Sequence, residues 1–187
     1  MSDIANEHGF PLWTSLAMIF NGWSSARIGK AGEAVALLTN GLAIYRGTGC
    51  TLTTSFDLAS LAEAYALLSQ PAESLSKLDE AMRFIETTNE RFYEAAIYRV
   101  RGDVLSATGD RAAAEESYHH ALAVARSQTA KTLELRAATS LARLWRDQGK
   151  RTEARDLLAP VYGWFAEGLD TPFLQEAKKL LDQLGGG

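Results

Sequence analysis

Apolar and small residues recur along this chain with helical spacing from about residue 12 onward, and turn-forming residues interrupt the pattern at regular intervals. This pattern predicts a series of helices joined in consecutive antiparallel pairs. The expected ranges are 12–28 with 31–46, 52–68 with 71–87, 91–108 with 111–127, and 131–148 with 151–167.

The last segment of the chain is amphipathic. Thr171 and Pro172 suit the cap and the first turn of a helix. The apolar stripe that follows consists of Phe173, Leu174, Ala177, Leu180, Leu181 and Leu184, and the polar back includes Glu176, Lys178, Lys179 and Gln183. This pattern predicts a helix that shields the open end of the last pair.

A fixed period relates the four pairs. The expected turn residues Gly29, Ser69, Gly109 and Gly149 follow one another at intervals of 40 residues. Small residues stand seven positions before and five positions after each of them: Gly22, Ala62, Gly102 and Ala142, and Ala34, Ser74, Ala114 and Ala154. Small side chains allow two helices to cross closely. Such a period is typical of a solenoid, so the sequence predicts an all-α solenoid of four helix pairs plus a C-terminal capping helix.

Three parts are expected along the chain. Residues 11–170 hold the four pairs, and residues 171–187 hold the capping helix and a flexible glycine tail. Residues 2–9 align with residues 42–49 and 82–89, the ends of second helices, after the 40-residue shift. Residues 1–10 are therefore expected to be the remnant of an upstream helix. The chain is therefore expected to be the C-terminal piece of a longer array, or a shortened relative of one. Pro160 lacks an N–H group and predicts a kink in the second helix of the fourth pair.

Two sets of residues resemble the tetratricopeptide motif. They are Leu61, Ala62, Tyr65 and Ser69, and Gly102, Gly109, Ala114, Tyr118 and Ala121. HEAT-type repeats can also be 40 residues long, and they remain the alternative fold.

A narrower resemblance concerns residues 137–184, notably 140–145 and 158–165, together with residues 7–13 and 61–65. They resemble the C-terminal end of bacterial multidomain proteins that combine a class III adenylate or guanylate cyclase domain, a signal-transduction ATPase domain and tetratricopeptide repeats. The resemblance implies a regulatory region of a signalling protein. It implies neither cyclase activity nor ATPase activity, because no segment of this sequence resembles the catalytic domains.

Charge and composition argue against several classes of partner. The chain has 19 basic and 23 acidic residues and a net charge of −4, whereas nucleic acid selects a basic surface. The same charge argues against anionic membranes, and no run of about 18 apolar residues is present to span a bilayer. The single cysteine, Cys50, cannot form an internal disulfide, and no secretory signal is visible. A cytoplasmic location is the simplest expectation.

No pattern in the sequence indicates catalysis. Gly29 and Lys30 are followed by Ala31, which leaves a phosphate-binding loop incomplete. His119 and His120 are neighbours on a helix and point about 100° apart, so they cannot share a metal as an i, i+4 pair would. We therefore expect a protein that is not an enzyme and has no cofactor and no metal ligands.

Side chains on the first helix of each pair are the candidates for partner binding, because this helix lines the concave face of tetratricopeptide arrays. The candidates are Trp23, Phe56, Glu63, Arg99, Asp103, Arg136 and Arg143. Their character changes from aromatic through acidic to basic, which suits a protein or peptide of mixed character. The alternative is that these charges only solvate the face or pair with each other, as Arg99 with Asp103.

A sensor that binds a small molecule is the second functional hypothesis. A pocket enclosed by Trp23, Phe56 and Arg99 would favour it, whereas an open groove would favour a scaffold.

Self-association through the N-terminal end is also expected. The first helix presents Trp13, Leu16 and Phe20, and with its other apolar residues it offers more apolar surface than one partner helix can cover. An exposed apolar patch of this kind often marks a contact site, and a two-fold homodimer is the simplest closed arrangement.

Overall fold

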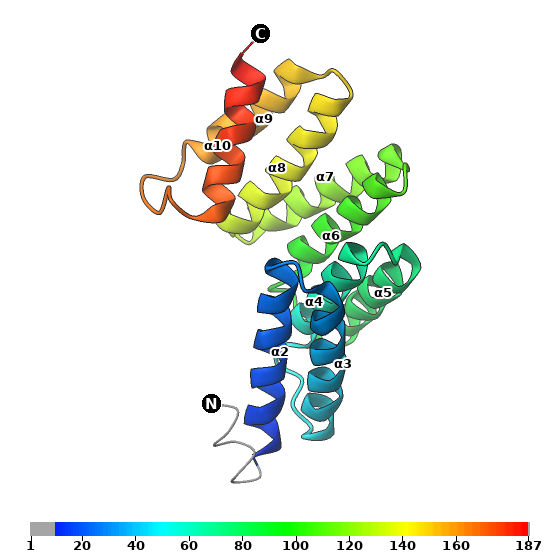
Figure 1. Cartoon of the computed structure of the whole chain (residues 1–187). Coiled ribbons are helices and arrows are strands. Elements are labelled where there is room, and N and C mark those ends of the chain that lie inside the picture. The colour runs from blue at the N-terminus through cyan, green and yellow to red at the C-terminus, as the bar shows by residue number, and fades with distance from the viewer. Residues whose placement is uncertain (1–9, 187) are drawn as a thin grey trace. The chain divides into compact units, whose positions relative to one another are not determined.

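The computed structural model describes residues 10–186, and every helix or strand assigned within that range is an α helix (Figure 1). The helices are α2 (Pro11–Arg27), α3 (Ala31–Gly47), α4 (Thr54–Leu67), α5 (Pro71–Thr88), α6 (Glu94–Ala107), α7 (Arg111–Ser127), α8 (Lys131–Asp147), α9 (Arg151–Tyr162) and α10 (Pro172–Gly185). The predicted all-α class, the helix pairs and the C-terminal helix are confirmed for this part of the chain. The expected upstream remnant at residues 1–10 lies, apart from Phe10, outside the described residues.

The chain divides into two compact units, which the repeat pattern did not predict. The first ends at Tyr93 and contains α2–α5, and the second begins at Glu94 and contains α6–α10. Within the first unit α2 packs on α3 and α4 packs on α5, while α4 also contacts α2 and α3. Within the second unit α8 similarly contacts α6, α7 and α9. Helix α10 packs on both α8 and α9, as expected of a cap for the last pair.

The turn inside each pair has the same backbone in all four pairs. The anchors adopt positive φ angles of 83° at Gly29, 57° at Ser69, 92° at Gly109 and 82° at Gly149. The next residue donates its N–H to a carbonyl five positions earlier, as in Lys30 to Ser25 at 2.9 Å and Gln70 to Tyr65 at 3.0 Å. This bond and the left-handed residue are the Schellman ending of a helix. Ser69 adopts the same conformation as the glycines, so the turn is kept although the glycine is not.

The turns between pairs form a second periodic column, which the sequence analysis missed. Gly49, Asn89 and Thr129 have φ angles of 79°, 60° and 52°, and they too are 40 residues apart. Only one of the three is a glycine, so no glycine column marks these turns in the sequence.

The small residues produce the predicted close crossing within a pair. A Cβ atom on Gly22 would lie 2.8 Å from Leu38 Cγ, and one on Gly102 would lie 2.5 Å from Tyr118 Cε1. In the second pair Ser74 Oγ donates a hydrogen bond of 2.8 Å to the carbonyl of Ala62. A larger residue in either column would therefore push the two helices apart.

The end of the fourth pair differs from the prediction. Helix α9 ends at Tyr162, whereas the pattern predicted a helix to residue 167. Pro160 lies in its last turn and supplies no N–H for a bond to Asp156, so it helps to end the helix instead of kinking a longer one. Trp164, which the prediction placed inside this helix, is 60% exposed. Thr171 is the N-cap residue of α10 and Pro172 its first helical residue, as predicted, although the Thr171 side chain makes no capping hydrogen bond.

Candidate binding surfaces of the two units

Aromatic rings gather in the first unit around Phe56 of α4. The Phe56 ring centroid lies 6.5 Å from those of Phe20 and Trp23 on α2, and 5.0 Å from that of Tyr93. Tyr93 in turn lies 5.9 Å from Phe92. We call these five residues the aromatic cluster. Their tilted and edge-on geometries are those that aromatic pairs prefer.

Part of the aromatic cluster is open to solvent. Phe20 is 53% exposed and Phe92 is 51% exposed, while the other three rings are half-buried. The guanidinium of Arg27 lies 5.0 Å from the centroid of the Trp23 ring, a cation–π contact. The first unit therefore presents rings that are anchored on one side and accessible on the other.

Two of the predicted binding candidates, Trp23 and Phe56, lie together in this cluster. Glu63 is half-buried on the same helix as Phe56, seven residues further along. Phe92 and Tyr93 were missed because the sequence pattern placed them inside a helix from residue 91. The structure places both in the turn before α6, which begins at Glu94.

A buried carboxyl group lies at the start of α4. Thr53 Oγ1 donates to Asp57 Oδ2 at 3.2 Å, whereas Asp57 Oδ1 is buried without a hydrogen-bond partner among the described residues. Burial raises the pKa of Asp57 to about 7, and the negative charge of Glu90 acts in the same direction. The Thr53 hydrogen bond and the positive charge of Arg46 oppose this shift.

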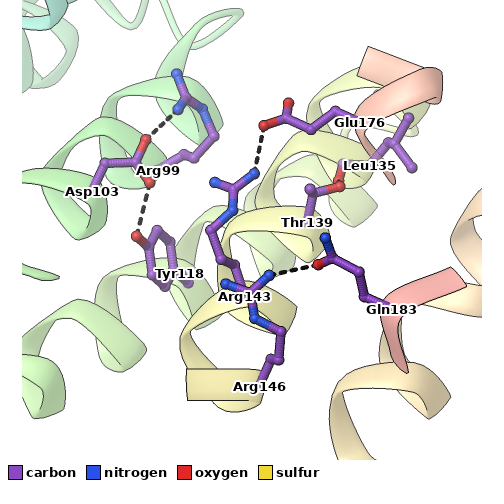
Figure 2. A network of polar contacts seen from close by, with 9 residues as sticks. All are labelled: Arg99, Asp103, Tyr118, Leu135, Thr139, Arg143, Arg146, Glu176 and Gln183. Carbon is purple, nitrogen blue, oxygen red and sulfur yellow. Dashed lines mark hydrogen bonds and ion pairs between the residues drawn. The ribbon is translucent and has the colours of Figure 1, made fainter. Parts of the chain in front are cut away.

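In the second unit Arg99 and Asp103 form an ion pair one turn apart on α6 (Figure 2). The Tyr118 hydroxyl donates to the other carboxylate oxygen of Asp103 at 2.8 Å. Burial, and then the charge of Asp103, raise the pKa of Tyr118 far above its ordinary value, so the phenol remains a donor. Arg99 is only 8% exposed. The structure thus shows the pairing of Arg99 with Asp103 that the sequence left as an alternative to partner binding.

Arg143 of α8 lies beside the C-terminal helix. Its guanidinium forms an ion pair with Glu176 of α10, and three residues further along α8 Arg146 donates to Gln183 Oε1 at 2.8 Å (Figure 2). The remaining candidate, Arg136, is half-buried, with its guanidinium 4.6 Å from the centroid of the Phe173 ring.

Two hollows adjoin Arg143. The inner hollow has a volume of about 270 Å³ and is lined by Asp103, Ser106, Ala107, Tyr118, Ser140, Arg143, Leu144 and Asp147. The cap hollow has a volume of about 220 Å³ and is lined by Arg143, Arg146, Glu176, Lys179, Leu180 and Gln183. Arg143 is the one side chain that both hollows share.

The sequence placed Glu176, Lys179 and Gln183 on the polar back of the last helix, but they line the cap hollow. Their spacing of three and four residues puts them on one stripe of α10, and this was the available signal. The expected single groove from Trp23 to Arg143 stays a prediction, because these residues belong to separate units. The enclosed pocket of Trp23, Phe56 and Arg99 stays untested for the same reason.

Residues 10–186 include no group of three or more histidine, cysteine or acidic side chains placed to hold a metal ion. In the same part of the chain, no helix combines the length and apolar character needed to cross a bilayer.

The chain matches two family models. A tetratricopeptide repeat-like domain matches residues 67–143, and a tetratricopeptide repeat matches residues 135–162. None of the curated proteins compared with the chain is significantly similar to it in sequence.

Several solved structures share its fold. The TPR-like repeats of a Podosopora anserina protein assigned as a kinesin light chain superpose with a TM-score of 0.62 at 23% identity, over 90% of this chain and 92% of that one. A single-residue variant of the same repeats gives 0.61 at 22% identity, over 90% and 91% of the two chains. MamA gives 0.55 at 15% identity, over 97% and 85%. At these identities the likeness concerns the fold alone. The matches confirm the tetratricopeptide interpretation over the HEAT-type alternative, and this chain is a tetratricopeptide-repeat protein.

Proposed function

We propose that this protein is a non-catalytic module that binds a segment of another protein through the aromatic cluster of its first unit. The observation that supports this proposal most directly is the set of five linked rings around Phe56, two of them more than half exposed. Aromatic side chains dominate the energetics of protein interfaces, because they bury a large area at a low entropic cost.

The surroundings of the cluster fit a peptide partner with an apolar or aromatic anchor. Phe56 is fixed by packing against the core of the first unit, so its ring is held in place before a partner arrives. Pre-organised rings reduce the ordering cost of binding. Arg27 and Glu63 supply charges of both signs on the same helices, and these suit polar residues flanking the anchor.

We also propose that the module is the regulatory C-terminal region of a bacterial cyclase or ATPase signalling protein. The support is only the sequence resemblance of residues 7–13, 61–65 and 137–184. The reading frame that surrounds this sequence in its genome would test it. A frame without cyclase and ATPase domains would refute this part of the proposal and leave the binding function intact.

Selection of peptides from a displayed library on the whole chain tests the binding function. Selected peptides should contain aromatic or large apolar residues, and their affinity is measured by isothermal titration calorimetry. Phe20→Ser and Phe92→Ser should each weaken binding about tenfold, since loss of one interface anchor typically costs at least ~1 kcal/mol.

Leu67→Ser is the matched control, because Leu67 is 60% exposed on α4 and lies outside the cluster. Circular dichroism checks that each variant is folded. Failure to select any peptide, or an equal loss of affinity in the control, would refute the binding function assigned to the cluster.

A further inference from the structure

The cap hollow between α8 and α10 has an excess of positive charge. Three cationic side chains line it, Arg143, Arg146 and Lys179, against the single carboxylate of Glu176. Lys179 forms no ion pair with any residue in the described part of the chain. Since Arg143 pairs with Glu176 and Arg146 with Asp147, the excess positive charge of the hollow is that of Lys179, and it attracts anions.

The contact between Arg143 and Glu176 shows which chemical group fits this hollow. A carboxylate of this chain already lies on the guanidinium, the arrangement that arginine forms best with carboxylates (Figure 2). Both partners are accessible, since the Arg143 side chain is 41% exposed and that of Glu176 is 53% exposed. An ion pair in such contact with water contributes little to stability, so a second carboxylate can replace Glu176 at small cost.

We propose that the cap hollow binds an acidic side chain from an extended protein segment, whose carboxylate replaces Glu176 on Arg143 and also interacts with Lys179. The inference rests on the proposed binding function and names the chemistry of a partner for the second unit. A protein segment is the occupant favoured over a free anion because the inner hollow adjoins the same arginine and can hold further residues of the segment.

The inner hollow indicates what lies next to the acidic residue. Its carboxylates are already engaged, since Asp103 accepts bonds from Arg99 and Tyr118 and Asp147 pairs with Arg146. Ser106 and Ser140 contribute hydroxyl groups to its wall. This surface suits an uncharged polar residue, so the segment that fits both hollows alternates acidic and small polar side chains.

Fluorescence anisotropy with a fluorescein-labelled peptide of alternating glutamate and serine tests the proposal on the whole chain. A peptide with glutamine in place of each glutamate is the matched ligand control. The glutamate peptide should bind at least about fivefold more tightly than the glutamine peptide, and the difference should shrink at high salt.

Variants of the hollow separate a defined site from general charge attraction. Arg143→Gln and Lys179→Gln should each weaken binding about fivefold or more. Lys178→Gln makes the same change of charge on the same helix, at an exposed residue that pairs with Asp182, and should change affinity less than about twofold. Glu176→Gln should tighten binding about two- to fivefold, because it removes the internal competitor.

The results of these experiments distinguish a protein segment from a small anion as the occupant of the cap hollow. Equal affinity for the two peptides, equal losses in the Arg143 and Lys178 variants, or weaker binding by Glu176→Gln would each overturn the proposal. Inorganic phosphate titrated alone is the further probe, and a phosphate site that depends on Arg143 without preference for the glutamate peptide would assign the hollow to small anions instead. If library peptides still bind the aromatic cluster while the glutamate peptide does not bind, only this inference fails and the proposed function stands.

Discussion

The ionisation of Asp57 should make the free energy of unfolding of the first unit depend on pH, and replacing Asp57 by asparagine should remove this dependence. The pKa of Asp57 is raised to about 7 in the folded chain, against about 3.9 in an unfolded chain. Between these two values the folded state holds a proton that the unfolded state has lost. The free energy of unfolding therefore falls as the pH rises through this window, and it becomes independent of this group above about pH 7.

The size of the effect follows from the two pKa values. A shift of roughly three units corresponds to about 4 kcal/mol over the whole titration, of which about 2–3 kcal/mol falls between pH 5 and pH 8. The physical source is the burial of a carboxylate, 1% exposed, with one oxygen that has no hydrogen-bond partner among the described residues. The neighbouring charges of Arg46 and Glu90 act on it in opposite directions.

Urea unfolding followed by circular dichroism, at intervals from pH 5 to pH 8, measures this contribution. The informative quantity is the change with pH of the difference in stability between Asp57→Asn and the wild type. Other groups cancel in it, including Glu80, whose pKa is lowered because hydrogen bonds from Lys77 and Arg46 outweigh the effect of burial. The variant should gain about 2–3 kcal/mol relative to the wild type as the pH rises from 5 to 8.

Glu86→Gln is the control, since it makes the same type of change at a residue that is exposed on α5. A change below about 0.5 kcal/mol for Asp57→Asn would refute the reasoning. It would mean that water reaches the carboxylate in the folded chain and that Asp57 ionises near its ordinary pKa.

Two further predictions concern packing and assembly. Gly102→Ala should lower the free energy of unfolding by about 1–3 kcal/mol, because the new Cβ would lie 2.5 Å from the Tyr118 ring. Gly32→Ala is the control, since a Cβ at Gly32 has open space, and this substitution should be neutral or stabilising. Equal urea midpoints for the two variants would contradict the crossing geometry. The wild-type chain should form a dimer in light scattering, because Trp13 and Phe20 of α2 are 51% and 53% exposed. The double variant Trp13→Glu, Phe20→Glu should be monomeric. A monomeric wild type at high micromolar concentration would exclude the dimer.

The helix pairs could be predicted because two requirements of the fold act on residue type at fixed positions. A close crossing admits only small side chains, and Gly22 and Gly102 meet their partner helices at distances that no Cβ could tolerate without a shift. A left-handed turn favours glycine, and three of the four turns inside pairs have it. In the turns between pairs, Asn89 and Thr129 adopt a left-handed φ angle like that of Gly49. These three positions share a backbone conformation but no residue type, so no sequence pattern marks them.

The candidate sites were less predictable because they depend on which helix lies opposite each side chain. The pattern gave the position of Arg143 on α8, but its partner Glu176 comes from a helix placed by the segment after α9. That segment was predicted as helix to residue 167, so α10 could not be oriented from the sequence. Phe92 and Tyr93 were missed for a related reason, since a helix start three residues too early removed them from the turn they occupy.

Two sets of equivalent residues on the first helix of each pair show how a small rotation around the helix separates buried from accessible side chains. Positions six and ten residues before each turn are four residues apart, which is a rotation of only about 40° around the helix. The nearer column, Trp23, Glu63, Asp103 and Arg143, is half-buried throughout, whereas the farther column, Ile19, Ala59, Arg99 and Thr139, is buried in every pair. A buried arginine requires a counter-charge, and Asp103 one turn further along supplies it to Arg99. Arg143 belongs to the accessible column, and its paired carboxylate is itself exposed, so a partner can compete for Arg143 but not for Arg99.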